Sequence, residues 1–202
     1  MNYTVDLSQK LKPCKSKICK ACGLYLKQGP VYEMGNKPGV FWVGLSAVQF
    51  EDNEEKIPLS PFTASGALIN EIEKPFTEYI SFYKTNLVKC APTNGKRIRY
   101  PLLHEMQKCF PNLEWELKEG KPAVVFLLGK QVSTFIIKKL LNVEPYLDSQ
   151  FNYLPIRVNN INFIPIHHPS YILVYKRKHL QEYINSIQKL FEKQQSFASS
   201  LV

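Results

Sequence analysis

Three short apolar runs constrain the fold of this chain more than any other feature. They read GVFWVGL at 39–45, FYKTNLVKC at 82–90 and AVVFLLG at 123–129, and glycine or polar residues close them. Such continuous runs are typical of parallel strands that are buried on both faces. Helical patterns at 65–76 and 101–120 separate the runs. The sequence therefore predicts an α/β fold with a central, mainly parallel sheet flanked by helices in three layers.

The C-terminal part of the sequence completes this pattern. Residues 154–169 predict two strands around the turn pair Asn159-Asn160, and 178–195 has the spacing of an amphipathic helix. No internal repeat or low-complexity linker divides the chain. We therefore expect a single domain over residues 1–195 and a flexible tail at 196–202.

Parallel strands gather their carboxyl ends at one edge of the sheet, where ligands bind in α/β folds. On that rule four groups of residues should meet at this edge. They are Leu45-Ser46, Asn86 to Cys90, Gly129 and His167-His168. The sequence thus predicts a binding site built from amide, thiol, hydroxyl and imidazole groups.

The charge of the chain favours a polyanionic partner. Twenty-six Lys and Arg against 17 Asp and Glu give a net charge of +9, which suits nucleic acid but also a merely basic, solvated surface. No apolar run reaches the roughly 20 residues that span a bilayer. The N-terminus lacks the apolar segment of a signal peptide. We expect a cytoplasmic monomer without a membrane partner.

Five cysteines form a second notable set. Cys19 and Cys22 make a C-x-x-C pair, Cys90 and Cys109 lie far downstream, and Cys14 is left over. Four thiolates from distant parts of a chain suit an iron–sulfur cluster better than zinc, whose ligand pairs are usually both closely spaced. Cys90 and Cys109 are equally typical of small buried hydrophobes. The spacing alone leaves both interpretations open.

Several motifs, in a fixed order, resemble the uracil-DNA glycosylase superfamily. They read YKTNLVKCAP, PLLHEMQKCFPNL, KPAVVFLLG and HHPS, over roughly residues 14 to 175. The branch that they resemble most is the iron–sulfur type, family 4. Its second motif keeps the spacing P-x-x-x-E-x-x-x-C-x-P-x-L, which here falls on Pro101, Glu105, Cys109, Pro111 and Leu113.

The resemblance implies a role for individual residues. Cys19, Cys22, Cys90 and Cys109 would ligate a structural 4Fe–4S cluster, with Cys14 as a rival ligand. Asn86 would read the edge of a flipped base, beside Gly44 and Leu45, and Phe62 would stack on it. His168 would donate a hydrogen bond to the base oxygen as charge develops there, with His167 as the alternative. Ser170 and the wedge Tyr171, Ile172 and Leu173 would contact DNA.

The first active-site motif departs from that branch. Where the branch reads GEAPG or GEGPG, this chain reads GLSAV at 44–48, so Leu45 replaces the acidic residue beside the attacking water. Ser46 or Asp52 is the candidate to position that water instead. The longer loop after Cys90 carries the candidate phosphate contacts Lys96, Arg97 and Arg99, and 176–178 forms a second basic group.

The resemblance predicts a DNA glycosylase that releases uracil or another aberrant or modified base and leaves an abasic site. Leu45 supports an alternative, an iron–sulfur DNA-binding protein without catalysis that recognises a lesion or a single strand. A zinc-stapled nucleic-acid module is a third interpretation, which a brown protein containing iron and sulfide would exclude.

Overall fold

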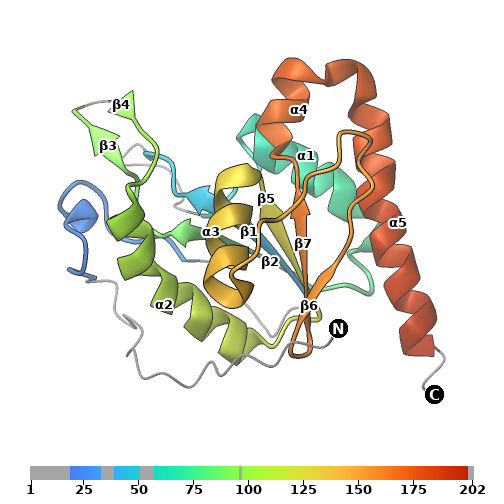
Figure 1. Ribbon diagram of the computed structural model, residues 1–202. Coiled ribbons are helices and arrows are strands. Elements are labelled where there is room, and N and C mark those ends of the chain that lie inside the picture. Colours follow the sequence, from blue (N-terminus) through green and yellow to red (C-terminus); the bar gives the residue numbers. More distant parts are fainter. Residues whose placement is uncertain (1–18, 33–38, 51–56, 96, 200–202) are drawn as a thin grey trace.

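The computed structural model describes residues 19–32, 39–50, 57–95 and 97–199 (Figure 1). Its centre is a five-stranded sheet in the order β2-β1-β5-β7-β6. The first four strands in this order run parallel, and β6 pairs antiparallel with β7 at the edge. The strands are β1 (Val40–Ser46), β2 (Phe82–Val88), β5 (Val124–Leu128), β6 (Ile156–Val158) and β7 (Ile161–Ile166). The predicted three-layer α/β fold is confirmed.

Helices cover both faces of the sheet, with α2 and α3 on one side and α1, α4 and α5 on the other (Figure 1). Two short strands, β3 (Thr93–Asn94) and β4 (Arg97–Ile98), form a hairpin of their own. The helices are α1 (Ala64–Glu73), α2 (Leu103–Gly120), α3 (Lys130–Leu141), α4 (Pro169–Tyr175) and α5 (Leu180–Ser199), with short 3-10 turns at Leu24–Leu26, Lys74–Phe76 and Arg177–His179. None of the described helices is both long and apolar enough to cross a membrane.

Alternation along β1 divides the interior into two cores. Phe41 and Val43 pack toward α2 and α3, while Val40 and Trp42 pack toward α1 and α5. Phe191 of α5 closes the second core, since its ring lies edge-on to Trp42 at a centroid distance of 6.2 Å. This burial on both faces is the reason that the strands read as continuous apolar runs.

Two helices and one helix end differ from the sequence analysis. Helix α3 follows Gly129 directly, and its buried residues Val132, Ile136 and Leu140 recur at intervals of four. Helix α4 occupies the segment in which only a wedge was expected, with Pro169 in its first turn. Helix α5 continues to Ser199, so regular backbone extends into the segment that was expected to be a tail.

Candidate functional site

A cavity of about 890 Å³ lies at the carboxyl ends of the parallel strands. Residues in the C-terminal parts of β1, β2 and β5, or just after β1, β5 and β7, converge on it, as the carboxyl-end rule predicts. Of the residues expected at this edge, those that line the cavity are Leu45, Ser46, Asn86, Gly129 and His168. His167 and Cys90 are not part of its lining.

Asn86 presents a buried amide to this cavity. The residue is 2% exposed, and no hydrogen bond engages its side chain among the described residues. It lies opposite Gly44 in the β1–β2 register. A Cβ atom at Gly44 would be 2.3 Å from Asn86 Oδ1, so only glycine leaves room for the amide. A buried amide without partners favours a ligand that offers both a donor and an acceptor.

His168 lies across the same cavity, at the N-terminal cap of α4. Its Nδ1 accepts a hydrogen bond from the backbone N–H of Ser170 at 3.1 Å and lies 2.7 Å from the Ser170 hydroxyl. Because Nδ1 acts as acceptor, the neutral ring carries its proton on Nε2. Burial lowers the pKa of His168 below its ordinary value of 6.5. The side chain is therefore a neutral N–H donor.

His167 belongs to a different environment. Its Nδ1 lies 2.9 Å from the Tyr153 hydroxyl, and its ring stacks on Tyr171 at a centroid distance of 5.5 Å. Its carbonyl accepts a hydrogen bond from Tyr183. Of the two adjacent histidines, only His168 reaches the cavity.

The end of β1 contributes Leu45 and Ser46, and the described residues 47–50 that follow contain no carboxylate. Leu45 packs partly against the first core, and Ser46 is half-buried in the cavity wall. Asp52, the other candidate for positioning water, lies outside the described residues. The sequence therefore leaves the Ser46 hydroxyl as the polar side chain between Gly44 and Val48.

Gln28 fixes the next part of this loop, and sequence reasoning missed it. Its Nε2 donates to the Val48 carbonyl at 2.9 Å, and its Oε1 accepts from the Phe50 N–H at 2.9 Å. Gln28 lies on the N-terminal segment that carries Cys19 and Cys22. A single glutamine is not a recognisable sequence motif, so the sequence alone could not predict this link between the cysteine segment and the cavity.

Phe62 does not lie where the resemblance placed it. Its side chain is 92% exposed and is not part of the cavity lining. The reason is the turn that caps α1: the Thr63 hydroxyl donates to the Ser60 carbonyl at 2.8 Å and accepts from the Gly66 N–H at 3.1 Å. Ser60 and Thr63 face the cavity, which leaves Phe62 outside. Among the described residues, the aromatic side chains that line the cavity are Phe50, Tyr100, Tyr171 and Tyr175.

The predicted wedge also requires correction. Ile172 is fully buried in the second core, and Leu173 packs partly against it. Both residues lie on the side of helix α4 that faces the second core, so their side chains point inward. Ser170 and Tyr171 do line the cavity.

The basic residues after Cys90 have separate roles. Arg99 forms two hydrogen bonds to Glu105, at 2.8 and 2.6 Å, and Glu105 also accepts from the Leu102 N–H at 2.7 Å. The Arg99 guanidinium is the main reason that the pKa of Glu105 lies below its ordinary value. Arg99 therefore stabilises the start of α2. Arg97 is exposed, and Lys96 lies outside the described residues.

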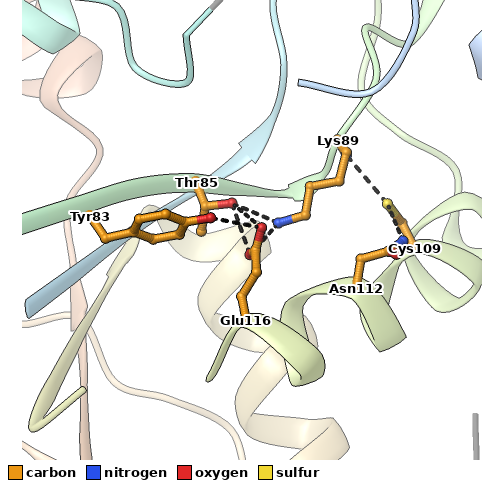
Figure 2. Close-up of polar contacts among 6 residues, drawn as sticks. All are labelled: Tyr83, Thr85, Lys89, Cys109, Asn112 and Glu116. Carbon is orange, nitrogen blue, oxygen red and sulfur yellow. Dashed lines mark hydrogen bonds and ion pairs between the residues drawn. The ribbon is translucent and has the colours of Figure 1, made fainter. Parts of the chain in front are cut away.

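Three of the four described cysteines belong to the first core or pack against it. Cys19, Cys90 and Cys109 are buried, and the half-buried Cys22 packs against the same core as Cys90 and Cys109. Cys109 Sγ accepts hydrogen bonds from the Lys89 backbone N–H at 3.3 Å and from Asn112 Nδ2 at 3.7 Å (Figure 2). Burial raises the pKa of the Cys109 thiol, and the Lys89 ammonium opposes that rise.

Four thiols, of which Cys109 accepts two N–H hydrogen bonds at its sulfur, match the donor chemistry of an iron–sulfur cluster. Within the described ranges, no three Cys, His, Asp or Glu side chains are grouped so as to hold a metal ion. Cys14 lies outside these ranges. The donor chemistry of the four thiols fits a cluster.

A buried ion pair lies beside these cysteines and was not predicted. Lys89 Nζ contacts Glu116 Oε2 at 2.5 Å and the Thr85 hydroxyl at 2.6 Å, and the Tyr83 hydroxyl donates to Glu116 at 3.2 Å (Figure 2). The Lys89 and Glu116 side chains are 1% and 2% exposed. The network joins β2, which carries Asn86, to α2, which carries Cys109.

The fold and the cavity together define an α/β protein whose parallel strands end at a cavity that is lined by a buried amide, Asn86, and by His168. The chain belongs to the uracil DNA glycosylase superfamily, whose family model matches residues 34–192.

Two similar proteins fit this assignment, and a solved structure supports the fold. A Type-4 uracil-DNA glycosylase of Saccharolobus solfataricus is 30% identical over 129 residues, 60% of this chain and 56% of that protein. A Type-4 uracil-DNA glycosylase of Sulfurisphaera tokodaii is 29% identical over 127 residues, 60% of this chain and 54% of that protein. The matches thus span just over half the length of each relative. The structure of wild-type Pedobacter heparinus SMUG2 superposes with a TM-score of 0.53 at 14% identity, covering 80% of this chain and 77% of that one, which supports the fold.

Proposed function

We propose that this protein is a DNA glycosylase that hydrolyses the N-glycosidic bond of uracil or another aberrant or modified base and leaves an abasic site. The observation that carries this proposal is the buried Asn86 amide, which no described residue engages and which faces the same cavity as His168. Membership of the superfamily supplies the reaction class.

The proposed mechanism assigns each step to a side chain of the cavity. The nucleotide leaves the base stack, because its glycosidic bond is out of reach inside a duplex. The Asn86 amide then pairs with the polar edge of the base, over Gly44. As the bond breaks, negative charge develops on the base, and Nε2–H of His168 donates to the base oxygen that bears it. Water attacks the sugar carbon, and we assign its positioning to the Ser46 hydroxyl, with Asp52 as the alternative.

A gel assay tests this function. Anaerobically purified protein is incubated with labelled oligonucleotides that carry uracil, single-stranded or opposite G or A, and then treated with alkali. We expect strand cleavage at uracil and none in a matched thymine oligonucleotide. Absence of cleavage with retained DNA binding would contradict uracil excision and favour the non-catalytic lesion binder that Leu45 suggests.

We further propose that Cys19, Cys22, Cys90 and Cys109 hold a 4Fe–4S cluster. When bound, the cluster would cross-link the N-terminal segment to both ends of residues 90–109, and the hydrolytic steps would use the other residues named above. The hydrogen bonds from Lys89 and Asn112 to Cys109 Sγ support a thiolate at this position.

Iron and acid-labile sulfide analysis tests this proposal. We expect a brown protein with about four iron and four sulfide per chain, as the cluster type requires. Replacing Cys90 with alanine should remove both, while the matched Cys14→Ala variant should keep them. A colourless protein that contains zinc would contradict the assignment, and iron loss in Cys14→Ala would place Cys14 among the ligands.

A further inference from the structure

Large apolar side chains are exposed around the mouth of the cavity, which is unusual for a surface without a partner. On helix α4, Tyr171, Val174 and Tyr175 are 39%, 67% and 74% exposed. At and after β4, Ile98 and Tyr100 are 50% and 72% exposed. All five line the cavity, and both elements lie at the same end of the molecule (Figure 1). We call these five residues the aromatic rim.

The α4 part of the rim is one continuous helix face. Residues 171, 174 and 175 follow the i, i+3, i+4 spacing that places side chains together. The rings of Tyr171 and Tyr175 are 5.5 Å apart at their centroids, and Tyr171 stacks on His167 from the other side. The contacts with His167 and Tyr171 hold the rings in place, and the Tyr175 ring remains exposed on one face.

The charge around the rim favours a polyanion. None of the described residues that line the cavity is acidic, and Lys130 lies in its wall. Arg97 is exposed on the hairpin next to Ile98, and Arg177 and Lys178 are exposed just after α4. Aromatic faces combined with basic side chains are the pattern that binds single-stranded nucleic acid, since bases stack on the rings and phosphates pair with the cations.

The volume of the cavity is also larger than one base requires. Its volume of about 890 Å³ lies near the upper end of the range for pockets that hold an entire drug-sized ligand. Asn86 and His168 are only two of the residues that line it, which leaves space beside the rim for neighbouring nucleotides.

We propose that the aromatic rim binds the unpaired bases on either side of the flipped nucleotide, so that single-stranded DNA is the preferred substrate form. This inference rests on the proposed function for the identity of the flipped base. In a duplex the flanking bases remain stacked and paired, so their faces are not available to Tyr100 and Tyr175. The corrected position of Ile172 agrees with this view, because the buried side chain cannot fill a gap in a duplex.

Fluorescence anisotropy with uracil-free DNA tests the rim independently of catalysis. A labelled single strand of DNA, 15 nucleotides long, and the corresponding duplex are titrated with wild-type protein. The same titrations are made with Tyr100→Ala, Tyr175→Ala and the double variant. We expect each alanine to raise the Kd for the single strand about tenfold, because a base stacked on an aromatic ring contributes at this level. The Kd for the duplex should change less than about twofold, since its base faces are already stacked.

Three control variants accompany the alanine variants. Tyr100→Phe and Tyr175→Phe keep the ring and should bind like wild type. Tyr146→Ala removes a tyrosine that is 79% exposed but is not part of the cavity lining, and it should also bind like wild type.

The outcomes separate this inference from the proposed function. An equal loss for both DNA forms, a loss confined to the duplex, or no DNA binding at all would overturn it. A duplex-specific loss would make Tyr175 a wedge, and absence of binding would assign the rim to a different partner. If the alanine variants lose affinity for the single strand but uracil is not excised, the proposed role of the rim is supported and the proposed function is contradicted. If uracil is excised and the alanine variants bind normally, only the rim is refuted.

Discussion

Replacing Lys89 with methionine is expected to lower the free energy of unfolding by about 3–5 kcal/mol, because it leaves the Glu116 carboxylate buried without its cation. The side chains of the pair are 1% and 2% exposed, so water cannot take the place of the lost ammonium. Thr85 and Tyr83 would remain as hydrogen-bond donors to Glu116, but hydroxyl groups do not balance its charge. Since native domains are stable by only about 5–15 kcal/mol, the variant should be close to unfolding.

Urea denaturation followed by circular dichroism measures this effect under anaerobic conditions. Two variants serve as controls. Lys138→Met breaks an exposed ion pair with Glu144, whose side chains are 50% and 64% exposed, and should cost less than about 1 kcal/mol. The double variant Lys89→Met/Glu116→Leu removes both charges and should recover most of the loss. If the double variant is as unstable as Lys89→Met, the buried charge does not cause the loss of stability. The loss then comes from the changed shape of the side chain at position 89.

The Lys89–Glu116 pair lies close to the strand end that carries Asn86. Lys89 lies three residues after Asn86, and its backbone N–H donates to Cys109 Sγ. Its carbonyl also accepts a hydrogen bond from the Val31 N–H at 2.8 Å. The pair therefore fastens the end of β2 to α2 and to the N-terminal segment at the place where Asn86 must be held.

The parts of the fold that the sequence predicts are those set by local patterns. Strands buried on both faces produce continuous apolar runs, and these runs located β1, β2 and β5 to within two residues. The carboxyl-end rule then placed Asn86 and His168 in one cavity without any knowledge of the loops. Both residues lie at strand ends, where position follows from topology.

The remaining features depend on contacts that leave no local pattern. Lys89 and Glu116 are separated by 27 residues, and both types are usually solvated, so their pairing in the interior had no sequence signal. Gln28 acts across 20 residues in the same way. Phe62 and Ile172 were misplaced because motif order fixes position along the chain, whereas exposure depends on how the α1 cap and helix α4 turn each side chain.

Replacing His168 with alanine is expected to reduce the single-turnover rate of base excision about 10²- to 10³-fold, with little change in DNA affinity. The loss in rate follows from removing one preorganised donor at the position where charge develops. Affinity should persist because the donor matters most in the transition state. The assay measures uracil release from a single-stranded oligonucleotide under enzyme excess, beside anisotropy with the same strand.

The adjacent histidine provides the matched control. His167→Gln alters a ring that is held by Tyr153 and Tyr171 outside the cavity lining, so the rate should fall less than about tenfold. An equal loss in both variants would indicate disruption of the strand end instead of loss of a donor.

The pH dependence of the rate tests the protonation state of His168. Burial lowers its pKa below 6.5, so the neutral ring, with Nδ1 accepting from Ser170 and Nε2 donating, persists at pH values where an ordinary histidine is protonated. The wild-type rate should therefore stay level as pH falls from 8 through 6.5, and decline only below that, when protonation removes the Nδ1 acceptor and disturbs the ring. The His168→Ala variant should lack this decline. A wild-type rate that falls already above pH 6.5 would mean that a different group controls the reaction, and the alanine variant would then keep the same profile.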